Sequence, residues 1–157
     1  TFHFKRYFFT EREHLQKQGG ERLLTFYWQN IDNHSIEARF SVIIQDGMAY
    51  SPLRATFGGV DFSEEISKEK LLEFLTLSVL KLARISSDTS IQAKACGTFI
   101  INAYPESYLV QSQIEKLENC LFKLGFEISI TELNYEIRIS NKTFYETMLS
   151  TRPQRTE

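Results

Sequence analysis

A glycine pair between an apolar strand and a long amphipathic helix is the feature that most constrains the fold of this chain. Residues 50–62 read YSPLRATFGGVDF. Gly58 and Gly59 allow a sharp turn and let backbone amides approach a ligand closely. A helix that begins at such a turn adds partial positive charge at its N-terminus. The pattern predicts a bend from a central strand into a helix packed across a sheet, where α/β folds place phosphates or carboxylates.

The length and composition indicate one domain with a real core. The chain has 157 residues, 42% of them hydrophobic, and a formal net charge of −2. We expect a single domain over residues 1–150 and a polar tail or truncated linker over residues 151–157. The near-neutral charge argues against a general nucleic-acid binder. The sequence contains no run of about 18 apolar residues, so we expect no membrane span.

The cysteines and histidines do not form a metal-binding pattern. Cys96 and Cys120 lack the CxxC spacing of zinc sites and redox pairs, and Cys120 lies on the apolar side of a predicted helix. Cys96, at a predicted strand end, stays open as a nucleophile. His3, His14 and His34 are scattered without metal-ligand spacing, which favours surface positions. We therefore expect no metal and a reduced, cytoplasmic protein.

The periodicity of apolar residues predicts an α/β (α+β) fold: a mixed, largely antiparallel sheet of about six strands flanked by helices. The Asp46-Gly47 pair predicts a tight turn between two of the strands. Ser67 is expected to cap the long helix, and Thr10 a short one. The predicted elements, in order, are a helix at 11–18, strands at 23–28, 36–44 and 48–53, a helix at 67–84, a strand at 90–96, a helix following a capping box at 112–115, strands at 126–130 and 135–139, and a helix at 143–149.

This order is similar to the GNAT acetyltransferase fold, from its first hairpin to its closing hairpin. Residues 50–59 (YSPLRATFGG), 124–126 (LGF) and 131–137 (TELNYEI) resemble the first half of bacterial Fem-type proteins. Those proteins carry two GNAT-like halves in one longer chain, and the resemblance covers roughly residues 23–150. It implies acyl or aminoacyl transfer, acetyl-CoA or another acyl donor, a small-molecule or peptide-like substrate, and a second GNAT-like domain in the native chain.

The resemblance also implies a donor-binding loop. Its candidate cofactor-binding residues are Arg54, Phe57, Gly58 and Gly59. Arg54 could orient a carboxylate or phosphate, or could instead pair with Asp61 or Glu64. The glycines could cradle an anion, or could simply provide a turn. Because Asp61, Glu64 and Glu65 would repel a pyrophosphate, we expect this half to contribute chiefly substrate contacts.

Further candidates follow the predicted strand at 90–96. Tyr104 is a candidate general acid and Glu106 a candidate general base, with aromatic packing and a solvated carboxylate as the alternatives. The candidate substrate-binding residues are Ser51, Tyr108 and Asn134. Ser51 could instead be an ordinary strand-end hydroxyl, and Asn134 a turn residue.

Three functions stay open from the sequence. The first is the substrate-side or non-catalytic half of an acyl- or aminoacyltransferase. The second is a non-catalytic binding module on the same scaffold. The third is an independent acetyltransferase, in which Arg54, Gly58 and Gly59 would hold the cofactor.

Overall fold

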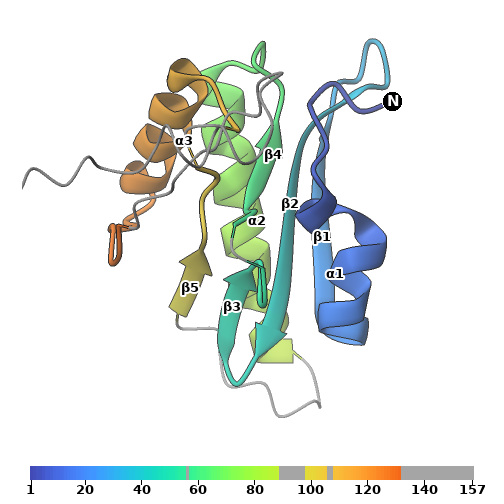
Figure 1. Cartoon of the computed structure of the whole chain (residues 1–157), viewed down its shortest axis with the longest axis vertical. Helices are drawn as coiled ribbons and strands as arrows, with labels where there is room; N and C mark the ends of the chain where they lie inside the picture. Colours follow the sequence, from blue (N-terminus) through green and yellow to red (C-terminus); the bar gives the residue numbers. More distant parts are fainter. Residues whose placement is uncertain (56, 89–97, 106–107, 132–157) are drawn as a thin grey trace, which may run out of the picture.

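The computed structural model describes residues 1–55, 57–88, 98–105 and 108–131 (Figure 1). Over these residues the chain is a mixed α+β structure with a five-stranded, mostly antiparallel sheet. The strands are β1 (Leu23–Gln29), β2 (Ile36–Gln45), β3 (Met48–Ser51), β4 (Val60–Phe62) and β5 (Thr98–Ile101). The helices are α1 (Arg12–Gly19), α2 (Lys68–Asp88) and α3 (Gln111–Lys123), with short 3-10 helices at Phe8–Thr10 and Gly20–Arg22.

The long strand β2 organises the sheet. It pairs along one edge with β1, and on the other edge it pairs with β4 near its start and with β3 near its end. Helix α1 and the N-terminal segment cover one face, and α2 covers the other (Figure 1). The interior of β2 is therefore buried on both faces. Ala38 and Phe40 join the core beneath α2, whereas Ile43 packs under Gly19 of α1.

The β2–β3 hairpin follows the predicted turn. Asp46 and Gly47 both have positive φ, 52° and 75°. These angles match the two-residue turn whose twist suits a hairpin. The prediction from Asp46-Gly47 is confirmed.

Strand β5 runs parallel to β3 and lies within the segment that the sequence predicted as a connection. Its register pairs Met48 with Thr98 and Ser51 with Ile101. That part of the prediction is wrong, because the exposed Ile100 on the edge strand removes the polar alternation that marks a half-buried strand. The predicted strand at 90–96 lies outside the described residues.

The predicted strand at 126–130 is also wrong as far as the structure describes it. Residues 126–131 have no strand assignment, and Ile128 and Ile130 are exposed. A strand needs a neighbour for its backbone hydrogen bonds. Its expected partner at 135–139 and the expected helix at 143–149 lie outside the described part of the chain.

Helix α2 contributes Leu71, Phe74, Leu75 and Leu82 to the core. Its predicted cap is confirmed, since the Ser67 Oγ accepts the Lys70 N–H at 3.2 Å. Leu82 has no exposed surface, but Leu77 and Leu80 are about half exposed. These two leucines therefore lie outside the core that the rest of the helix face helps to form. No helix in the described ranges has the length and apolar character needed to cross a membrane.

Helix α3 begins earlier than its predicted capping box. Gln111 is its first residue, so Ser112 lies inside the helix. The side chain of Gln113 instead accepts the Val110 N–H at 3.4 Å. Cys120 is fully buried in the core, as predicted, and burial raises the pKa of its thiol.

Truncation of Leu82 to alanine tests the core assignment. We expect Leu82→Ala to lower the free energy of unfolding by about 2–5 kcal/mol, because it leaves a cavity under α2. Leu80→Ala on the same helix is the matched control and should cost less than about 1 kcal/mol, since Leu80 is half exposed. Urea unfolding followed by circular dichroism measures both, and equal losses would contradict the assignment.

Candidate functional site

The glycine pair lies where the chain rejoins the sheet, at the end of the segment that connects β3 to β4. Strand β3 ends at Ser51, and β4 begins at Val60 against the same edge of β2. Asn102 joins the two ends: its N–H donates to the Ser51 carbonyl at 3.0 Å, and its carbonyl accepts the Gly58 N–H at 2.9 Å. The predicted bend directly into a helix is wrong, because the glycines lead into β4 and α2 begins only at Lys68.

Glycine is required at this return for steric reasons. Gly59 has φ of +95°, and an added Cβ would lie 3.0 Å from Cγ2 of Ile101. A Cβ on Gly58 would lie 2.9 Å from Cδ of Pro52. Both glycines therefore allow the backbone to lie closer to Pro52 and Ile101 than a residue with a Cβ atom could. The Gly58 N–H is already bonded, which leaves it unable to cradle an anion.

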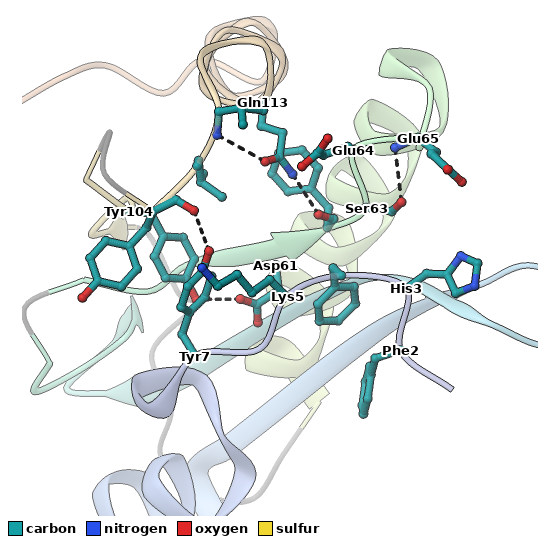
Figure 2. A pocket seen from close by; sticks show the side chains of 15 residues that line it. Phe2, His3, Lys5, Tyr7, Asp61, Ser63, Glu64, Glu65, Tyr104 and Gln113 are labelled. Carbon is teal, nitrogen blue, oxygen red and sulfur yellow. Dashed lines mark hydrogen bonds between the residues drawn. The ribbon is translucent and has the colours of Figure 1, made fainter.

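Beyond Asn102, β4 and the chain after β5 separate around a cavity of about 610 Å³ (Figure 2). Asp61 and the residues that follow it form one wall, and Tyr104, Tyr108 and the first turn of α3 form another. The N-terminal segment supplies a third wall, which includes Phe2, Phe4, Lys5 and Tyr7. Three segments that are distant in the sequence thus enclose one space.

A buried ion pair lies at the base of this cavity. Arg39 of β2 and Asp61 of β4 are direct cross-strand partners. Nε and Nη2 of Arg39 donate to Oδ2 of Asp61 at 2.9 and 2.7 Å. The other carboxylate oxygen accepts the Tyr104 hydroxyl at 2.6 Å and the Thr10 hydroxyl at 3.3 Å. Asp61 therefore accepts four hydrogen bonds within the protein.

Burial has the largest effect on the pKa of the Asp61 carboxyl group. It raises the pKa of Asp61, although the charge of Arg39 and the hydrogen bonds of Tyr104 and Thr10 oppose the shift. Burial and the negative charge of Asp61 also raise the pKa of Tyr104. Tyr104 therefore keeps its proton at neutral pH and directs it to Asp61.

Aromatic rings connect the cavity wall to the segment that joins β3 to β4. Phe57 packs between Phe9 and Tyr108, with ring centroids 5.1 and 4.6 Å away. Tyr7 lies 4.9 Å from the ring of Tyr104 and donates its hydroxyl to the Tyr108 carbonyl. These contacts fix the N-terminal segment against the chain that follows β5.

Of the residues predicted from sequence, the cavity brings together Tyr104 and Tyr108. Ser51 is buried, and its Oγ donates to the Ser41 carbonyl. Arg54 is exposed outside the cavity, and its backbone N–H donates to the Gln18 side chain at 3.0 Å. Asp61 pairs with Arg39, so the expected alternative pairing of Arg54 with Asp61 is wrong. Glu106 and Asn134 lie outside the described residues.

Sequence reasoning missed three members of the site. Arg39 lies within the strand predicted at 36–44 and received no role from the sequence, and Asp61 was expected to repel a pyrophosphate or to pair with Arg54. Thr10 appeared as a helix cap, but its hydroxyl lies beside Asp61 and within 3.1 Å of the Tyr7 carbonyl, and it accepts a hydrogen bond from Nη2 of Arg39 at 3.0 Å. The available signal was a pair of opposite charges, with Arg39 inside the apolar segment 36–44 and Asp61 inside the apolar segment 60–62.

A comparison of the chain with family models, with curated proteins and with solved structures finds no match in any of the three. Within the described ranges, His, Cys, Asp and Glu side chains do not gather in groups of three or more that could hold a metal ion.

Removal of the Asp61 carboxylate tests the ion pair. We expect Asp61→Ala to lower the free energy of unfolding by about 3–5 kcal/mol, because Arg39 would stay buried without a partner. The double variant Arg39→Met with Asp61→Leu should recover most of this loss, since it buries no charge. Urea unfolding of the three proteins measures the effect; a double variant as unstable as Asp61→Ala would contradict the explanation.

The steric role of Gly59 has a separate test. Gly59→Ala should destabilise the protein by more than about 1 kcal/mol, because its φ is positive and Ile101 blocks the added methyl group. Gly20→Ala is the control, since Gly20 also has positive φ but its Cβ would meet nothing within 4 Å. A smaller loss at Gly59 than at Gly20, measured by thermal unfolding, would contradict the close approach.

Proposed function

We propose that this chain is a GNAT-like acyltransferase domain of the Fem type that binds substrate in the cavity between β4 and the segment after β5. The observation that carries the proposal is the pairing of β3 with β5. These parallel strands stay paired up to Asn102, and beyond it β4, which follows β3 along the same edge of β2, and the chain after β5 line opposite walls of the cavity. GNAT enzymes use such an opening between strands to seat the pantetheine arm of their acyl donor.

The local chemistry favours the substrate over coenzyme A as the ligand. The connection from β4 to α2 carries Glu64 and Glu65, both exposed and both at the cavity. Their charges would repel a pyrophosphate at the start of α2. Gly58 and Gly59 lie before β4, away from that helix start. A second domain would then provide the acyl donor.

A second candidate is a non-catalytic binding module. It is favoured by the state of Asp61 and Tyr104, whose hydrogen bonds satisfy each other at the base of the cavity. A carboxylate that accepts four hydrogen bonds has little capacity left to remove a proton from a substrate. A cavity with this base would bind a ligand without transferring anything to it.

Acetyl-CoA titration separates the substrate-binding half from an independent acetyltransferase. We expect calorimetry to give a dissociation constant weaker than about 1 mM, for which the binding free energy is about −4 kcal/mol. Glu64→Gln with Glu65→Gln is the matched variant and should bind acetyl-CoA somewhat more tightly, because it removes the repulsion. Micromolar binding by the unaltered chain would contradict the proposal.

The coding sequence beyond residue 157 distinguishes one half of a two-domain acyltransferase from a binding module. A second GNAT-like domain encoded beyond residue 157 would support the first, and a stop codon directly after that residue would remove the twin-domain version. Where the second domain exists, acyl transfer by the complete protein should fall when bulky residues are placed in the cavity. Unchanged transfer would favour the binding module.

A further inference from the structure

The polar groups that line the cavity are largely satisfied inside the protein. Tyr104 donates to Asp61, Tyr7 to the Tyr108 carbonyl, and Gln113 to the Phe62 carbonyl, while the Ser63 hydroxyl accepts the Glu65 N–H (Figure 2). A ligand that must form several hydrogen bonds would therefore compete with bonds that already exist. The walls instead offer aromatic faces and the charge of nearby carboxylates.

The charges around the cavity favour a cation. Arg39 balances Asp61 beneath the floor, so the carboxylates of Glu64 and Glu65 carry the remaining negative charge on that wall. Two cations oppose them: the exposed ammonium group of Lys5 lines the N-terminal wall, and the ammonium group of Lys116, outside the cavity lining, donates to the backbone carbonyls of Glu64 and Ile66. Within the lining itself, a cationic ligand would be attracted by the two glutamates and opposed by Lys5.

The protein already places its own cations against aromatic rings here. The Nζ of Lys5 lies 5.1 Å from the centroid of the Tyr7 ring. The guanidinium of Arg39 lies 5.5 and 5.6 Å from the rings of Phe2 and Phe4. All three distances fall within the range of cation–π attraction. Lys5 thus occupies an aromatic position that an external cation could take.

We propose that the cavity binds a trimethylammonium group and that Lys5 is a built-in competitor for its aromatic position. A quaternary ammonium carries positive charge but has no N–H to satisfy, whereas a primary ammonium has three donors. The first suits walls whose uncharged acceptors are largely occupied and whose free carboxylates act on it through charge alone, and aromatic faces are the usual protein contact for it. This inference uses the same cavity as the proposed function but does not depend on acyl transfer.

Choline is the probe for this site, and 3,3-dimethylbutan-1-ol is its uncharged isostere. Titration of the full chain, followed by NMR, should show choline binding about tenfold more tightly than the isostere. 2-Aminoethanol, which has a primary ammonium, should also bind more weakly than choline. Equal binding of choline and the isostere, or no binding of either, would overturn the proposal; tighter binding of 2-aminoethanol would overturn the preference for a quaternary group.

Substitution of Lys5 tests the competition. Lys5→Gln should tighten choline binding by about threefold to tenfold, because it removes the internal cation. Lys81→Gln is the control of equal charge change, on an exposed part of α2 outside the cavity. Equal effects of the two variants would reduce the role of Lys5 to general electrostatics and would overturn the competition.

A pair of substitutions at Tyr7 separates the aromatic face from the fold. Tyr7→Phe keeps the ring and should keep choline binding, whereas Tyr7→Leu should weaken it about tenfold. Circular dichroism checks that both variants are folded, and equal choline affinity of the two folded variants would overturn the aromatic contact. Choline binding and acetyl-CoA binding are read separately, so failure here is distinct from failure of the proposed function.

Discussion

The buried pair of Arg39 and Asp61 is the interaction on which the arrangement of this protein depends. It joins β2 to β4, and through Thr10 and Tyr104 it also holds the N-terminal segment and the chain after β5. Burial of two charges is costly, and the attraction between them repays that cost only when the remaining hydrogen bonds are also made. Here both carboxylate oxygens are occupied. The pair therefore selects one relative placement of four segments.

The cavity arises because β3 and β4 form two separate strands along one edge of β2. Strands β3 and β4 occupy one edge of β2 in succession, and only β3 has β5 beside it. Gly58 and Gly59 allow the chain to rejoin the sheet at β4. Asn102 is hydrogen-bonded to Ser51 and to Gly58, at the two ends of the segment that connects β3 to β4. Because β5 ends there, β4 lacks a strand on its outer side in the described part of the chain. Side chains from the N-terminal segment and from α3 then surround the space.

The sequence predicted the elements whose signals are local. The turn at Asp46 and Gly47, the helix start at Ser67 and the buried Cys120 each depend on a few neighbouring residues. The site was less predictable because a glycine pair has the same appearance before a helix as before a returning strand. The partner of Asp61 depends on the cross-strand register, which aligns residues distant in the chain. Strand β5 was missed because its exposed Ile100 interrupts the alternation of polar and apolar residues that marks a half-buried strand.

The same network limits the chemistry that the cavity can perform. The proton of Tyr104 is directed to Asp61, and the raised pKa of that tyrosine opposes its release. To protonate a departing thiolate, Tyr104 would have to break its bond to Asp61 and leave that carboxylate short of a donor in a buried place. The ion pair would lose part of the compensation for its own burial in the same step. The fixed network thus leaves Asp61 and Tyr104 poorly placed to move a proton, and the titratable side chains of the cavity walls that lie outside this network include His3, Lys5, Glu64 and Glu65.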